Sequence, residues 1–126
     1  MVSNVNELML KKANNYFNSK KYNDAIRVYY KLIQRKPEII VKIKAFMGLG
    51  KTLKYIYELE LASKMYKNAF ILARKLKDNE LVVQIEKIIE NIYVMKKDQD
   101  LEAVQIQFFM RSIMSLLSKF GKTDWF

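Results

Sequence analysis

The 126-residue chain contains no cysteine and no histidine. Without cysteine there is no disulfide, no thiolate nucleophile and no zinc–thiolate site. Without histidine the chain lacks the commonest general base and the commonest metal ligand, which removes every Ser-His and Cys-His catalytic arrangement. We therefore expect a protein that is not an enzyme and that needs no cofactor and no metal.

Turn-forming residues are also scarce, with three glycines and a single proline, Pro37. A fold of many short strands would need a turn about every ten residues, so this scarcity favours long helices. Hydrophobic residues make up 51% of the chain, which is enough to build the core of one domain. The composition predicts a single all-α domain over residues 1–126.

Long apolar runs are missing as well, since no stretch of about 18 apolar residues occurs. The nearest, residues 101–120, is interrupted by charged and amide side chains: Glu102, Gln105, Gln107, Arg111 and Lys119. The first fifteen residues lack the basic region and continuous apolar core of a signal peptide. We expect a cytoplasmic protein, with a nuclear location as the alternative.

The net charge of +10 is unevenly distributed, because residues 1–50 carry +7 of it. Such an excess suggests an acidic partner surface, although it also keeps a protein soluble. A second interpretation is binding to nucleic acid or an anionic membrane through this basic first third. Its basic residues are scattered over two expected helices and a linker, and no nucleic-acid motif accompanies them.

Apolar residues recur at helical spacing in successive segments of the chain. The pattern predicts helices from about residue 4 to 18 and from 22 to 36, where Pro37 stops the second. A similar pair follows, with apolar positions from Phe46 to Leu53 and from Ala62 to Phe70. The recurrence of two helices indicates an internal repeat.

Small residues mark equivalent positions in the two pairs of helices. Ala13 precedes Ala25 by twelve residues, and Gly50 precedes Ala62 by twelve. Helices cross closely only where side chains are small, so we expect these positions to be crossing points, with neighbouring aromatic residues filling the space beside them.

This pattern resembles the tetratricopeptide repeat (TPR) family. The first repeat carries the resemblance at Met9, Ala13, Tyr16, Ala25, Tyr29 and Pro37, with Lys12 in place of leucine. The second carries it at Phe46, Leu49, Gly50, Leu53, Ala62, Tyr66 and Ala69. The repeats are 37 residues apart rather than about 34, so we expect an elongated helix or linker between them.

The resemblance implies a right-handed TPR superhelix of about six antiparallel helices, with repeats near residues 5–38, 43–79 and 80–120 and a tail at 121–126. The third repeat is degenerate: one amphipathic helix is expected up to about residue 97, and the last helix would start after an N-cap at Asp100. This last helix would be a hydrophobic cap on the superhelix. Alternatively it forms a homodimer or partner interface through Phe108, Phe109, Ile113, Leu117, Trp125 and Phe126.

TPR domains bind peptides or partner helices in a concave groove lined by the first helix of each repeat. The resemblance places in that groove Asn14, Phe17, Asn18, Lys44, Met47, Lys51, Lys54, Tyr55, Lys87 and Asn91, with Leu10 and Gln84 beside them. A basic, amide-rich groove suits an acidic peptide or a C-terminal carboxylate. We therefore expect a protein-interaction module, an adapter, scaffold or assembly factor, whose partner is another protein and not a small-molecule substrate. Of the five residues with which one TPR subset grips the acidic tails of chaperones, only Asn14 is present, which argues against that role.

Two motifs could instead carry chemistry. The segment Ala45–Thr52 is one residue short of a phosphate-binding P-loop, with alanine at the position of the first glycine. The carboxylate pairs Glu86/Glu90 and Asp98/Asp100 could bind a cation, but surface and capping roles explain them as well. A nucleotide-binding enzyme would rest on Gly50, Lys51 and Thr52 alone.

Overall fold

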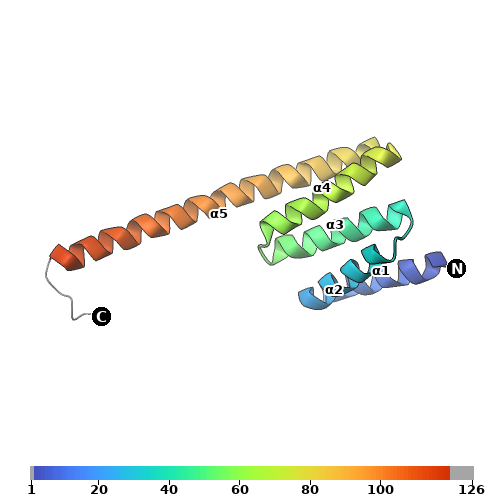
Figure 1. Cartoon of the computed structure of the whole chain (residues 1–126), viewed down its shortest axis with the longest axis horizontal. Helices are drawn as coiled ribbons and strands as arrows, with labels where there is room; N and C mark the ends of the chain where they lie inside the picture. The colour runs from blue at the N-terminus through green and yellow to red at the C-terminus, as the bar shows by residue number, and fades with distance from the viewer. Residues whose placement is uncertain (1, 120–126) are drawn as a thin grey trace. The chain divides into compact units, whose positions relative to one another are not determined.

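The computed structural model describes residues 2–119, and this part of the chain is all-α. Figure 1 shows its helices, which are α1 (Val2–Asn18), α2 (Tyr22–Gln34), α3 (Ile39–Tyr55), α4 (Leu59–Leu76) and α5 (Asn79–Lys119). Within residues 2–119, no helix has both the length and the apolarity needed to cross a membrane.

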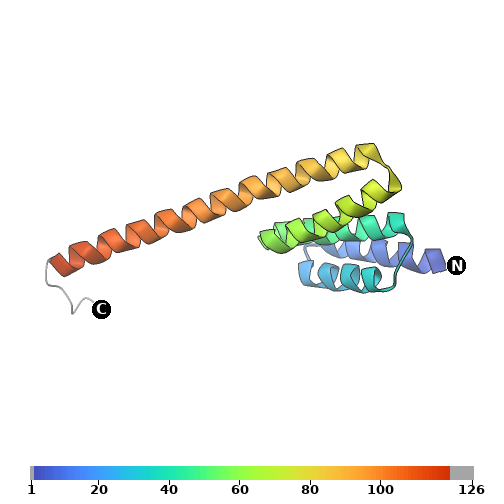
Figure 2. The ribbon, with the colours of Figure 1, turned by 45° about the horizontal axis from the view of Figure 1, so that its top comes forward.

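The first four helices form two successive helical hairpins. Helices α1 and α2 pack against each other, as do α3 and α4, and α2 and α1 also contact α3. Figures 1 and 2 show the helices of each hairpin side by side, joined by short turns. This architecture agrees with the internal repeat that the sequence predicts.

Small residues lie at the centre of this packing. Ala13, Ala25 and Ala62 have no solvent exposure, and Gly50 is buried. A larger side chain at such a position would separate the helices, so the burial supports their predicted role as crossing points. The larger core side chains fill the space around them and include Tyr29, Leu32, Ile43, Leu49, Tyr66, Ile85 and Ile92.

Left-handed residues, none of them glycine, terminate the first four helices. Lys20, Lys36, Tyr57 and Lys77 have φ between 52° and 61°. After α4, the amide of Asp78 donates to the carbonyl oxygen of Ala73 over 3.2 Å. This is the 6→1 hydrogen bond of a Schellman motif. The chain therefore makes its reversals without the glycines that usually mark them, which explains why the sequence contains so few.

The connection between the hairpins is short. Helix α2 ends at Gln34, before Pro37, and α3 begins only two residues after that proline, at Ile39. Helix α3 has 17 residues, as many as α1, so the spacing of 37 rather than about 34 residues does not come from a longer first helix in the second hairpin.

A buried polar contact ties the start of α1 to the end of α2. Asn6 is only 2% exposed, and its side-chain oxygen accepts a hydrogen bond from Nε of Arg35 over 2.9 Å. A buried amide oxygen without a donor would be costly, so Arg35 satisfies Asn6 while its own charge stays in contact with solvent.

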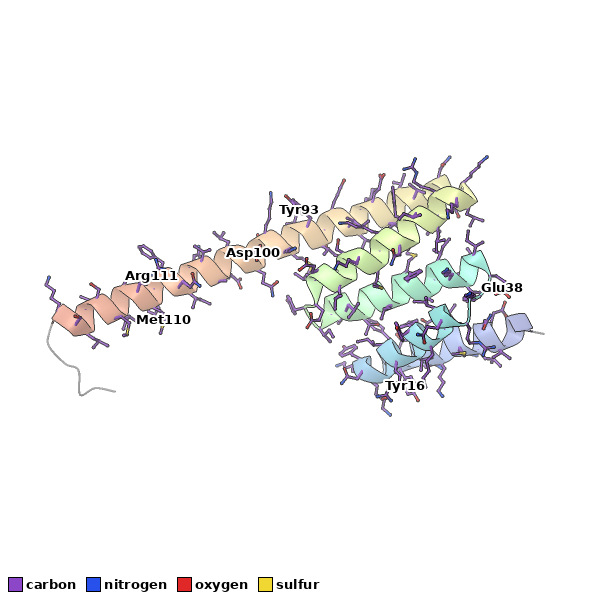
Figure 3. All side chains as sticks on the ribbon, in the orientation of Figure 1. Tyr16, Glu38, Tyr93, Asp100, Met110 and Arg111 are labelled. Carbon is purple, nitrogen blue, oxygen red and sulfur yellow. The ribbon has the colours of Figure 1, made fainter. Side chains whose placement is uncertain are left out.

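The chain divides into two compact units, and the boundary lies inside α5. The first unit ends at Tyr93, which is labelled in Figure 3, and the second begins at Val94. The first unit contains α1 to α4 and the beginning of α5, where Ile85 and Ile92 are buried. Among the described residues, the second unit consists of the rest of α5, a single helical segment.

The two helices expected after residue 79 form one helix of 41 residues. The prediction of a turn at Asp98 with an N-cap at Asp100 was wrong, so residues 2–119 form five helices where about six were expected. No glycine or proline lies between Asn79 and Lys119, and nothing in the local sequence interrupts the hydrogen bonds of a helix there.

Candidate functional site

A concave pocket of about 530 Å³ opens in the first unit, between the first helices of the two hairpins and the start of α5. Helix α1 contributes one face of its last two turns, and α3 contributes residues at matching helical spacing. The lining residues are Leu10, Asn14, Phe17, Asn18, Tyr29, Lys44, Met47, Gly48, Lys51, Tyr66, Gln84 and Ile88.

Two tyrosines from the second helices of the hairpins form the base of the pocket. Tyr29 of α2 and Tyr66 of α4 are 2% and 4% exposed. The hydroxyl of Tyr29 donates a hydrogen bond to the side-chain oxygen of Asn14, which fixes that amide on the pocket wall. Both rings pack against α3, the helix that separates them.

Two glycines of α3 make room for these rings. A Cβ atom on Gly48 would lie 2.7 Å from the hydroxyl oxygen of Tyr29, and a Cβ on Gly50 would lie 2.8 Å from ring carbons of Tyr66. Both distances are far below a normal carbon contact, so any side chain at these positions would displace a tyrosine. The sequence Gly48-Leu49-Gly50 thus serves the packing of the pocket base.

Burial also changes the acidity of these phenols. It raises the pKa of Tyr29 to about 12, with a smaller contribution from the neighbouring Tyr66. Burial alone raises the pKa of Tyr66 to about 12. Both hydroxyls are therefore neutral hydrogen-bonding groups at physiological pH and are not general bases.

The rim of the pocket is positively charged. Lys44 and Lys51 are exposed on α3, two helical turns apart, which separates them by about 10 Å along the helix axis. The ammonium nitrogen of Lys51 lies 4.5 Å from the centre of the Phe17 ring, a cation–π contact that holds this lysine over the pocket. No aspartate or glutamate is among the lining residues, so neither charge is neutralised within the pocket.

An aromatic cluster lies at one end of the pocket. Phe17 contacts Tyr55 edge to face, with the ring centres 5.1 Å apart. Tyr22, at the start of α2, lies 5.7 Å from Phe17 and 5.9 Å from Tyr55. Because these residues come from three helices, the cluster fixes the end of α1 against the end of α3.

The structure brings together most of the predicted groove residues. Six of the ten line the pocket: Asn14, Phe17, Asn18, Lys44, Met47 and Lys51. Leu10 and Gln84 line it as well. Tyr55 lies outside the lining but contacts Phe17. Lys54, Lys87 and Asn91 also lie outside the lining, with Lys54 partly exposed and the other two exposed.

Sequence reasoning missed Tyr29, Gly48, Tyr66 and Ile88 as pocket residues. The repeat pattern identifies both tyrosines, four residues after Ala25 and Ala62, but assigns them to the core. The burial of their rings agrees with that assignment, and their additional place at the pocket base depends on the two glycines opposite them.

The segment that resembles a P-loop is helical. Ala45–Thr52 lies entirely within α3, so its amide groups are engaged in the helix and do not form a phosphate-binding loop. Thr52 is fully buried and its hydroxyl donates a hydrogen bond to the carbonyl oxygen of Gly48 over 2.8 Å. It is thus unavailable to a magnesium ion.

The predicted interface residues lie on the second half of α5 as far as the structure describes them. Phe108 and Phe109 are 73% and 63% exposed, while Ile113 and Leu117 are partly exposed. Trp125 and Phe126 lie outside the described residues.

No protein-family model matches the sequence, and no curated protein matches it. The functional interpretation therefore rests on the pocket itself.

Proposed function

We propose that this chain is a non-catalytic protein-interaction module of the TPR type. Two successive helical hairpins with fully buried alanines at the crossing positions support the repeat assignment. In this proposal the first repeat spans about residues 5–38 and the second about 43–79. The region 80–120 takes the place of a third repeat, although its helix is continuous.

The proposed ligand is an acidic peptide or a C-terminal carboxylate of another protein. The observation that carries this proposal is a concave pocket with two exposed lysines, several amides and no acidic residue in its lining. Ammonium groups and amide N–H groups donate to carboxylate oxygens, and a charge-assisted hydrogen bond is about twice as strong as a neutral one. The apolar lining, Leu10, Phe17 and Met47, would contact the side chains beside the carboxylate.

The test is a binding titration with a peptide of defined chemistry. We would use a fluorescent peptide rich in aspartate and glutamate that has a free C-terminal carboxylate, and measure its fluorescence polarisation at physiological salt. Reversing the charge of Lys44 and Lys51 together (Lys44→Glu/Lys51→Glu) should weaken binding at least about 100-fold, because each change converts an attraction into a repulsion.

The matched control reverses two lysines outside the pocket. Lys64 and Lys67 are exposed on α4, and Lys64→Glu/Lys67→Glu makes the same change in net charge. This variant should bind the peptide within about threefold of the unchanged protein, because the screening length at physiological salt is only about 8 Å. Equal losses in both variants would mean that net charge and not the pocket governs binding.

Random-sequence nucleic acid in the same assay tests the second interpretation, binding through the basic first third of the chain. If such nucleic acid displaces the bound peptide, and if the affinity of the protein for the nucleic acid falls steeply with salt, the result would favour a nucleic-acid function over the proposed one.

A further inference from the structure

The second half of α5 has one wide apolar face. Between residues 101 and 119 the apolar side chains recur in steps of three and four residues, at Ile106, Phe109, Ile113 and Leu116, with Met110 and Leu117 beside them. Ile106 is 62% exposed, Phe109 63% and Leu116 55%. Alternating steps of three and four place all these residues on one side of the helix, which is the pattern of a helix that pairs with another helix.

The other side of this segment is mixed, because the exposed Val104 and Phe108 lie there among polar residues. Gln107, Arg111, Ser115 and Ser118 follow one another at helical spacing there. Figure 3 shows Met110 and Arg111 leaving α5 in different directions. Only two of these positions are amide or cationic and the other two are serines, so this side is poorly charged compared with a helix that lies on an anionic membrane.

The charges on the segment are arranged with opposite signs at its two ends. Glu102 lies at its beginning and Lys119 at its end, whereas Arg111 lies near its middle. An antiparallel copy would place its basic end beside the acidic beginning, while a parallel copy would place acidic residues beside acidic residues. The segment is therefore complementary in charge to itself in the antiparallel orientation.

The apolar face also has a hollow that a facing side chain could fill. Glu102, Gln105, Ile106 and Phe109 line a depression of about 260 Å³ on the second unit. In an antiparallel pair centred near Arg111, Phe109 and Ile106 would face the second copy's Ile113 and Leu116. Such insertion of a side chain between residues of the facing helix is the packing that coiled coils use.

We propose that residues 101–119 form an antiparallel helix pair with a second copy of this chain. The exposed apolar side chains on this face, Ile106, Phe109, Met110 and Leu116, supply the kind of surface that a stable interface needs. This self-association is independent of the pocket and of the function proposed for it, since the pocket lies in the first unit.

Sedimentation velocity of the full chain at micromolar concentrations tests the pairing. The unchanged protein should sediment as a dimer, at twice its 15.0 kDa mass. Phe109→Glu should raise the dissociation constant at least about tenfold, because it places a charge in the apolar face. Phe109→Ala, which keeps good helix propensity, should give a smaller loss in the same direction.

Phe108→Glu is the matched control, because Phe108 is as exposed as its neighbour but points about 100° away from it around the helix. It should leave the dimer intact. A protein that stays monomeric at all concentrations would overturn the proposal, as would equal effects of the two substitutions. Co-sedimentation of a monomeric protein with anionic vesicles, lost in Phe109→Glu, would overturn it in favour of a membrane surface.

Single cysteines test the orientation without background, because the chain has none of its own. In the antiparallel pair Ser112 lies near its own copy, so oxidised Ser112→Cys should yield a covalent dimer. Gln105 lies opposite residue 117, about 18 Å along the axis from its own copy, so Gln105→Cys should not. Efficient cross-linking at Gln105→Cys would contradict the antiparallel arrangement.

Discussion

Tyr29 and Tyr66 connect the core of the first unit to its pocket. Each ring is buried on the helix that carries it and packs against a glycine of α3. Because the Tyr29 hydroxyl also holds the Asn14 side chain, the same residue that fills the core orients a polar group in the pocket wall. A change at this position should therefore affect stability and ligand binding together.

Gly48 offers a direct test of this packing. Alanine normally stabilises a helix interior relative to glycine by about 1 kcal/mol. Gly48→Ala should instead lower the free energy of unfolding by about 1–3 kcal/mol, because its Cβ would overlap the Tyr29 ring. Denaturant titration of the unchanged and substituted proteins measures the difference.

The control for Gly48→Ala removes the ring that it overlaps. In a Tyr29→Ala background the new methyl group meets no ring, so Gly48→Ala should become neutral or stabilising there. Equal destabilisation in both backgrounds would show that the Tyr29 ring is not the cause.

At the scale of the element, the ends of the helices depart most from ordinary sequence preferences. Three of the four left-handed residues that end α1 to α4 are lysines and the fourth is a tyrosine. A residue with a side chain pays about 1–2 kcal/mol to adopt this conformation, and glycine does not. The helix ends therefore carry strain that a single substitution should relieve.

Lys77→Gly should raise the free energy of unfolding by about 1 kcal/mol, because Lys77 is the left-handed cap of α4 and has φ 61°. The matched control is Lys75→Gly, which changes the same residue type two positions earlier inside α4 and should lower stability by about 1 kcal/mol. Thermal unfolding followed by circular dichroism measures both. Loss of stability in Lys77→Gly would contradict a strained cap.

The ends and continuity of helices were also the hardest features to predict from the sequence. Apolar spacing identifies α1 to α4 and the small crossing residues, because both depend on local packing. The turn expected at Asp98 depended on two acidic residues that suit an N-cap, but such residues are also tolerated on an exposed helix surface. With no glycine or proline nearby, the helix continues through them.

At the scale of the whole molecule, alkaline pH should weaken the fold through its two buried tyrosines. Their pKa values of about 12 exceed the ordinary value of 10, so the folded state disfavours the phenolate. Their contribution to stability is complete below pH 10 and is lost as the pH rises through 12, because the unfolded chain ionises first. The loss should reach up to about 2 kcal/mol for each tyrosine.

Denaturant titrations between pH 9 and pH 12 would measure this loss, with the unchanged protein compared to Tyr29→Phe/Tyr66→Phe. The double variant should have a shallower dependence on pH, because it lacks both phenols. Tyr30→Phe, at an exposed position on α2, controls for the removal of a tyrosine as such. A pH dependence that the double variant leaves unchanged would assign the effect to other groups.

The sequence predicted the residues on the walls of the pocket better than the residues at its base. The resemblance to TPR proteins assigned residues of α1 and α3 to the groove, and six of these line the pocket. The sequence alone could not show that Lys87 and Asn91 lie outside the pocket lining, because their position depends on the direction that α5 takes after the turn at Lys77. The stacking of Lys51 on Phe17 joins residues 34 positions apart and has no signal in the local sequence.

The composition of the pocket walls has a thermodynamic consequence. Because the lining comes from both hairpins and from α5, the binding surface exists only while all of these elements are folded together. Any ligand that occupies it must stabilise the folded state by mass action, by a free energy that grows with the logarithm of its concentration over its dissociation constant. Unlabelled candidate partners can thus be ranked by how far each one raises the midpoint of unfolding.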